Sequence, residues 1–247
     1  MRVSLIPRLL VVGACFLLSV ASPVGAAMQV GAAGDRVGTS GNGSVSLDYA
    51  GTTAGRGLYI IVMMLTPTSP PTFGSVTISG ESNATLIGSV VRNATSGWAI
   101  QQAYLPALSS GGTKTVTATW TAEDSGAVIY VRELRDDVVG GIALDGHNGA
   151  SGSSADPSFT VTTGTNNALV IGGLYPGGND PTAGAGYTKT GISWFDFEAI
   201  QHNIDVGTAG AIPFNWTNAA GQWVMAAAGF KAASGGGGFN AFTRRRF

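Results

Sequence analysis

Two apolar runs decide the fold of this chain: AVIYVREL at residues 127–134 and ALVIGGLY at residues 168–175. Alternate side chains of a strand share a face, which divides the first run into Ile129, Val131 and Glu133 on one side and Val128, Tyr130, Arg132 and Leu134 on the other. A strand that is mostly apolar on both faces is typical of the middle of a sandwich rather than its edge. Gly172 and Gly173 interrupt the second run, where a bulge or the close approach of another backbone is expected.

The composition favours strands and turns over helices. Of the 247 residues, 44% are hydrophobic, only 11% are charged, and 38 are glycine, whereas about 25% of an ordinary soluble domain is charged. Serine, threonine and asparagine supply the remaining polarity, and threonine and glycine suit extended strands and tight turns. The length allows one large all-β domain or two small ones.

Short extended segments recur along residues 44–233, separated by turn signals such as TPTSPPTFG and SSGG. Val116, Ala118 and Trp120 alternate with threonines, which predicts a core face opposite a solvated face. About twelve strands without crossover helices predict an all-β fold, an antiparallel two-sheet β-sandwich of jelly-roll type with no substantial helix outside the leader. We expect residues 28–43 to form a flexible entry and residues 176–191 to form a long loop.

Residues 1–27 differ in kind from the rest. Arg2 and Arg8 precede the apolar run LLVVGACFLLSV, and SPVGAA follows it, which predicts a secretory signal peptide cleaved after Ala26 or Ala27. The alternatives are a buried N-terminal helix and a true translation start at Met28. Cys15 is the only cysteine and lies in this leader, so a mature chain would form no disulfide. No later stretch is apolar for about 18 residues, so we expect a protein that is not transmembrane. The leader predicts that it is extracellular or surface-exposed, either secreted or part of a virion.

The charges are few and unevenly placed. Without the two arginines of the leader, 11 basic residues face 14 acidic ones, for a net charge of −3. An acidic body argues against nucleic acid as a partner. After a Gly/Ser linker at residues 234–238, the tail FNAFTRRRF (239–247) is either a remnant without structure or a docking peptide for a homo-oligomer or larger assembly. Its aromatic and basic residues are Phe239, Phe242, Arg244, Arg245, Arg246 and Phe247.

Motifs for catalysis are absent from the sequence. It contains no G-x-S-x-G, Walker, dinucleotide or H-E-x-x-H pattern, and we expect no enzyme activity, no cofactor and no metal. His147 lies in DGHNG, where Asp145 and Asn148 would complete a metal site, but an Asx turn explains the same residues. Asp196 and Glu198 alternate along one strand, as a glycosidase pair or simply as an exposed strand face. A glycan hydrolase is therefore the least favoured function.

Aromatic side chains beside polar ones mark a candidate glycan site. Trp194 flanks Asp196 and Glu198, next to the predicted loop that begins at Tyr175 and contains Tyr187. A flat aromatic ring beside carboxylates and amides holds a sugar by stacking and hydrogen bonding. The alternative is that Trp194 packs in the core. The same residues therefore allow a secreted carbohydrate-binding module as a second function.

The order of features after residue 98 resembles that of β-sandwich proteins found among virion components of bacteriophages and prophages and among bacterial surface proteins. AVIYVREL is followed by the short connection VVGGIALD, then by SSADPSFTVTTGTNNALVIGGLY, and last by the Trp-containing strand QWVMAAAGFKA. The similarity covers residues 44–233 and rests on composition. It implies a structural role at a virion or cell surface, with contact to host-surface glycans and no catalytic residues. The signal-like leader departs from the virion pattern unless translation starts at Met28.

Overall fold

A computed structural model describes most of the predicted sandwich. The described residues are 28–35, 43–66, 69–121, 126–136, 141–191, 199–203, 206–217, 219 and 221–233. The predicted leader, linker and tail lie outside them. Every regular element in these ranges is a β-strand, which confirms the prediction of an all-β, antiparallel sandwich fold. None of the described ranges contains a helix long and apolar enough to cross a membrane.

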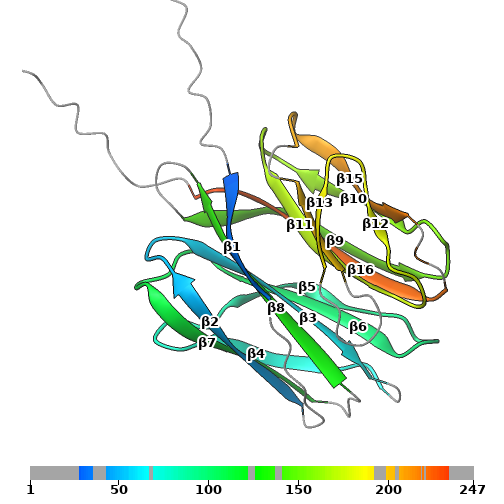
Figure 1. Cartoon of the computed structure of the whole chain (residues 1–247), viewed down its shortest axis with the longest axis horizontal. Helices are drawn as coiled ribbons and strands as arrows, with labels where there is room; N and C mark the ends of the chain where they lie inside the picture. The colour runs from blue at the N-terminus through cyan, green and yellow to red at the C-terminus, as the bar shows by residue number, and fades with distance from the viewer. Residues whose placement is uncertain are drawn as a thin grey trace, which may run out of the picture.

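The strands divide evenly between the two halves of the chain (Figure 1). The first half forms β1 (Met28–Asp35), β2 (Ser44–Thr52), β3 (Gly57–Leu65), β4 (Thr72–Ile78), β5 (Thr85–Arg92), β6 (Trp98–Leu105), β7 (Gly112–Thr121) and β8 (Gly126–Asp136). The second half forms β9 (Ile142–Gly152), β10 (Ser158–Thr163), β11 (Leu169–Pro176), β12 (Thr182–Ala183), β13 (Thr188–Gly191), β14 (Ala199–Asn203), β15 (Gly210–Thr217) and β16 (Trp223–Ala232).

Each half is a sandwich of one five-stranded and one three-stranded sheet. We call the five-stranded sheets inner sheet 1, in the order β1-β8-β3-β6-β5, and inner sheet 2, in the order β13-β14-β11-β16-β9. The three-stranded sheets are outer sheet 1, β2-β7-β4, and outer sheet 2, β10-β15-β12. The chain thus forms four sheets in two sandwiches, where the sequence alone suggested two sheets in one.

Three buried clusters show how the four sheets are stacked. The first lies between outer and inner sheet 1 and contains Trp120, and the third lies between inner and outer sheet 2 and contains Trp216. The second cluster joins the two inner sheets, with Tyr59 and Phe230 in edge contact at 5.7 Å. In Figure 1 the first sandwich lies below and the second above, and the inner sheets face each other between them.

The central strands of the inner sheets are buried on both faces, and their sequences are correspondingly apolar. All of β11 is buried, as is β3 except for its last residue, because one face meets an outer sheet and the other meets the second sandwich. In β8, Ile129 and Val131 face outer sheet 1, while Val128, Tyr130 and Leu134 face the second sandwich. The alternation predicted for this run is therefore confirmed.

The two sandwiches repeat the same strand order. Adding eight to each strand number of the first sandwich reproduces both sheets of the second. In the first sandwich β1 pairs with β8, β2 with β7 and β3 with β6, a nested pairing typical of a jelly roll, while β5 extends the inner sheet beside β6. A Trp-Thr pair ends both β7 and β15, at Trp120–Thr121 and Trp216–Thr217, and this short match is what a search for repeats could have found.

Two segments expected to be irregular form strands, and so does one for which no strand was predicted. Met28–Asp35 pairs with β8, the polar segment after residue 141 forms β9, and the expected loop 176–191 contains β12 and β13. These are edge or short strands. Their conformation is fixed by backbone hydrogen bonds to a neighbouring strand and depends little on their own side chains. At Gly172 and Gly173 the pairing of β11 shows no register shift, so close approach explains the glycines. A Cβ on Gly173 would lie 2.2 Å from Met63 Cε in the first sandwich.

Candidate functional site

The aromatic glycan site predicted from sequence is only partly within the described residues. Trp194, Asp196 and Glu198 lie outside them. Tyr175 is buried, with 4% of its surface exposed, and its ring stacks on Trp98 at 4.8 Å, so it offers no open face to a sugar. Tyr187 packs edge-on against Phe214 at 5.4 Å and donates a hydrogen bond to the Pro213 carbonyl. The two tyrosines belong to different buried clusters on opposite faces of inner sheet 2, so the fold does not bring them together.

A groove instead opens where the two sandwiches meet at their sides. Its volume is about 470 Å³, within the range of small-molecule sites. One wall is the edge strand β5, residues 87–92, and the other is the edge strand β9, residues 147–151, with Gln102 of β6 between them. Sequence reasoning missed this groove because its walls are about 60 residues apart in the chain and meet only when the inner sheets stack.

A bulge in β5 shapes the first wall. Ile87 pairs with Gln102 and Val91 with Ile100, so three residues of β5 face the single residue Gln101 of β6. Gln101 fills the gap by donating its side-chain amide to the Ile87 carbonyl at 3.0 Å. The bulge turns residues 88–90 out of the ladder and toward the groove.

Glycines set the distance between the two walls. Gly88 has a φ of 61°, and a Cβ there would lie 2.8 Å from His147 Cε1. A Cβ on Gly149 would lie 2.4 Å from Val91 Cγ2. Larger residues at these two positions would force β5 and β9 apart. The walls can therefore approach closely only because these positions lack side chains.

The groove offers several hydrogen-bond donors, beside hydroxyl and imidazole groups that can also accept. Gln102 is buried at 4% exposure, and its amide oxygen accepts a hydrogen bond from the Tyr59 hydroxyl at 2.7 Å. That bond leaves its amide nitrogen directed away from Tyr59, with no bond to another described residue. The Arg92 guanidinium is held from behind by the Thr66 carbonyl at 2.9 Å. Ser89 and His147 are exposed and likewise form no hydrogen bond with the described side chains.

The DGHNG segment does not gather metal ligands. It forms part of β9, not a turn, and each polar neighbour of His147 has other partners. Asp145 accepts hydrogen bonds from the backbone of Gly164 and Thr165 and pairs with Lys231 at 3.1 Å. Burial alone would raise the pKa of Asp145, but these bonds outweigh it and lower the pKa. Among the described residues no three His, Cys, Asp or Glu side chains come close enough to hold a metal.

A second polar cluster is buried between the inner sheets. Arg132 donates to the Tyr130 hydroxyl and to Thr190 Oγ1, the latter at 3.2 Å. His202 lies in the same interface, and its Nδ1 is buried with no hydrogen-bond partner among the described residues. Burial first, and then the positive charge of Arg132, lowers the pKa of His202 to about 4. Arg132 is buried while Thr190 is half-buried, so the cluster reaches solvent only at its edge, and we expect it to affect stability.

His202 should make the protein less stable below neutral pH. Its pKa is about 4 when folded and 6.5 ordinarily, so the unfolded chain takes up the proton first. The stabilisation is complete above pH 6.5 and disappears as the pH falls to about 4. A tenfold change in proton affinity corresponds to about 1.4 kcal/mol. Because His202 is not completely shielded from solvent, which screens part of this effect, we expect a loss on the order of 1 to 2 kcal/mol from this residue. Urea unfolding at pH 7 and pH 4.5 measures it.

The histidine contribution is isolated by comparing variants. His202→Gln should show a smaller drop in unfolding free energy between pH 7 and pH 4.5 than the unsubstituted protein. The matched control is His147→Gln, because His147 is exposed and is the only other histidine. Equal pH dependence in the unsubstituted protein and His202→Gln would contradict the assignment.

Comparison with known proteins finds no relative of this chain. The chain matches no protein-family model, no curated protein and no solved structure. The groove and the interface cluster must therefore be interpreted from their own chemistry.

Proposed function

We propose that this protein is a non-catalytic structural and adhesive β-sandwich protein of a virion surface or bacterial cell surface. In this proposal the folded body is a rigid spacer and contact surface, exported by the leader at residues 1–27 or assembled in the cytoplasm from a start at Met28. The tail at residues 239–247 joins copies of the chain or attaches them to a larger assembly. The sequence resemblance to virion and surface sandwiches supports the same role.

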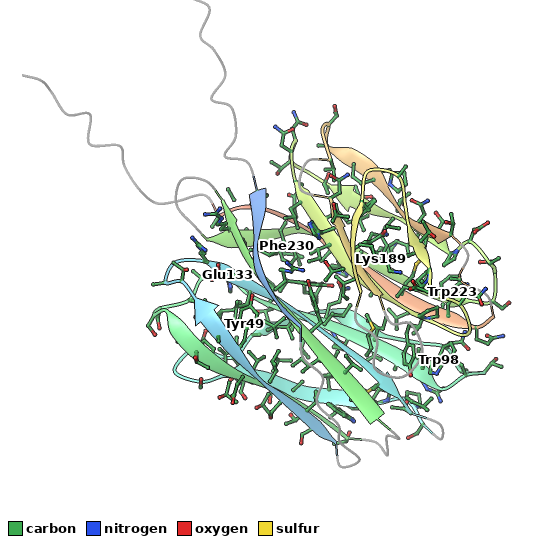
Figure 2. All side chains as sticks on the ribbon, viewed as in Figure 1. Tyr49, Trp98, Glu133, Lys189, Trp223 and Phe230 are labelled. Carbon is green, nitrogen blue, oxygen red and sulfur yellow. The ribbon has the colours of Figure 1, made fainter. Side chains whose placement is uncertain are left out.

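The observation that carries the proposal is the locking of the two sandwiches into one body. Their inner sheets share a continuous buried cluster, so neither sheet can expose its inner face to water without a large loss of hydrophobic stabilisation. Figure 2 shows Phe230 and Trp98 toward opposite ends of this interface. Phe230 contacts Tyr59 and Tyr104, and Trp98 stacks on Tyr175.

Hydrogen bonds close the same interface at its side. Asn93, in the turn after β5, donates its amide to the Gly152 carbonyl at 3.0 Å and to Gln222 Oε1 at 2.9 Å. Both acceptors belong to the second sandwich. Because Asn93 is only 5% exposed, these bonds are shielded from competing water. A body held in this way keeps its two ends at a constant separation, which suits a structural element on a surface.

The proposal is tested on the protein purified from its producing cells. We expect it in the surface or particle fraction, accessible to added protease, and larger than one chain by sedimentation. An N-terminus at Ala27 shows export with cleavage after Ala26. An N-terminus at Met28 fits both cleavage after Ala27 and a start at Met28, and the location of the protein outside or inside the cell then distinguishes the two.

A truncated chain provides the control for assembly. Deleting residues 234–247 should leave the melting temperature unchanged while reducing the sedimentation coefficient to that of one chain, and added salt should weaken assembly of the intact protein. A protein that remains soluble in the cell interior and sediments as one chain with or without the tail would contradict the proposed function.

A secreted carbohydrate-binding module is the second candidate, and the groove between β5 and β9 favours it. Such a module would bind glycans as a single chain, without surface attachment. A glycan array with the tail-deleted protein, together with its sedimentation, separates the two functions. Strong glycan binding by a soluble, secreted single chain would support the module instead of the structural protein.

A further inference from the structure

We propose that the groove between β5 and β9 binds a negatively charged saccharide, one that carries carboxylate or sulfate groups. This inference rests on the proposed function, because a surface protein that contacts glycans needs a site for them, and it specifies both the place and the ligand class. Tyr175 and Tyr187, the aromatic residues of the predicted glycan site that the structure describes, do not line this groove.

The charge of the groove selects an anion. Arg92 is the charged residue of its lining, and no carboxylate is among the described residues that line it. Arg92 forms no ion pair with any described acidic side chain. Hydrogen bonds from a guanidinium to a carboxylate or sulfate are shorter and about twice as strong as bonds between neutral groups. An acidic sugar would therefore gain more here than a neutral one.

The guanidinium is positioned before a ligand arrives. Its Nη2 donates to the Thr66 carbonyl at 2.9 Å and its Nε lies 3.4 Å from Thr66 Oγ1. Thr66 is fully buried, so this anchor is rigid. A side chain that is already ordered loses little entropy when it binds. The remaining guanidinium donors are left for a ligand.

Neutral donors and apolar carbons complete the requirements for a sugar. Gln102 contributes an amide nitrogen from the floor, and Ser89 a hydroxyl from the bulge. Val90, Val91 and Ala150 add apolar surface, which suits the C–H faces of a pyranose ring. The combination of one fixed cation, several neutral donors and an apolar wall matches a charged sugar better than a simple inorganic anion.

The backbone of β5 disfavours an added peptide strand. An extended peptide binds a sheet edge through a regular ladder of main-chain bonds. The bulge at residues 88–90 breaks that regularity, and the left-handed backbone at Gly88 interrupts the edge again. Bulges at an edge are a means of preventing strand addition. A ligand that binds through the side chains of the groove is therefore favoured over an added peptide strand.

The test measures binding of defined oligosaccharides to the purified protein by calorimetry and by amide chemical shifts. The probes are trigalacturonate, a sulfated heparin disaccharide and neutral maltotriose. We expect one or both anionic probes to bind, with shifts confined to residues 87–92 and 147–151 and the Gln102 side chain. Arg92→Gln should weaken binding about tenfold or more, because it removes the charged donor that meets the anionic group.

A groove-filling variant tests the location without removing a charge. Ser89→Trp should abolish binding, because the exposed Ser89 lines the groove. Its matched control is Ser158→Trp, at an exposed position of β10 outside the groove, which should bind normally. Melting curves of all variants show that each is folded.

Each failure has its own meaning. Equal binding of maltotriose and the anionic probes, normal binding by Ser89→Trp, or no binding of any anionic probe would each overturn the inference. Surface location and assembly do not depend on these variants. A surface protein that binds no probe therefore refutes the ligand site alone, whereas anion binding by an intracellular single chain refutes the proposed function alone.

Discussion

Replacing Trp216 with alanine is expected to lower the free energy of unfolding by about 3 to 5 kcal/mol. Trp216 is fully buried between inner and outer sheet 2, where it contacts Phe214 edge-on at 6.4 Å. Removing it leaves a large cavity among strands whose backbones are held by sheet pairing, so the site cannot collapse to fill the space. Urea unfolding monitored by circular dichroism gives the value.

Two further variants make the Trp216 result specific. Trp216→Phe should cost clearly less, because most of the ring volume remains and the indole N–H, buried without a partner among the described residues, is removed. Trp120→Ala, at the equivalent position of the first sandwich, should cost a similar amount, about 3 to 5 kcal/mol. Because the inner sheets share one core, both alanine variants should shift a single transition. Two separate transitions, with Trp216→Ala shifting only one of them, would mean that the sandwiches unfold independently.

Gly173→Val is expected to destabilise the protein by about 3 kcal/mol, the upper part of the range for overpacking. A Cβ at Gly173 would lie 2.2 Å from Met63 Cε and 2.9 Å from Ile61 Cδ1, both in the opposite sandwich. The extra methyl groups would push the two inner sheets apart at this contact. Urea unfolding again gives the free energy.

A second substitution should partly reverse this loss. Met63→Ala removes the side chain that valine would displace, so the double variant should be more stable than the sum of the two single effects predicts. Gly164→Val is the matched control, since a Cβ there meets only Asp145 Oδ1 at an ordinary 3.5 Å. Strict additivity of Gly173→Val and Met63→Ala would show that the sandwiches do not touch at this point.

The prediction of strand faces worked where the chain alternates strictly. In β7, Val116, Ala118 and Trp120 face the core, while the intervening threonines bond across the outer sheet, as Thr117 does with Ser46 at 2.7 Å. A two-residue period is a property of the strand itself, so it can be read without knowing the neighbours. The same reasoning assigned both faces of β8 correctly.

Strands without an apolar pattern were missed. The β9 segment reads IALDGHNGASG and is mostly half-exposed or exposed, yet it pairs with β16 along its length. Its conformation is imposed by β16, which is buried over most of its residues and offers a complete row of backbone partners. The composition of β9 does not reveal a partner strand that lies about 80 residues further along the chain.

For the candidate site too, nearness in sequence did not predict which residues lie together in the fold. Tyr175 and Tyr187 were grouped because they are near in sequence, but strand geometry sends them to opposite faces of inner sheet 2. The groove brings together Arg92, Gln102 and His147 from two sandwiches. The only local signals of it are the glycines at positions 88 and 149, and glycine is common throughout this chain.

By itself the sequence determined that this protein is built from antiparallel strands and which side chains of β7 and β8 point inward, since both follow from residue type and a two-residue period. Only the tertiary structure decided that the strands form two sandwiches of equal topology, that their inner sheets pack on each other, and that a groove opens beside that contact. The physical reason is distance along the chain. Alternation is a relation between neighbouring residues of one strand. The choice of partner sheet depends on burying contacts such as the one between Met63 and Gly173, which are distant in the chain.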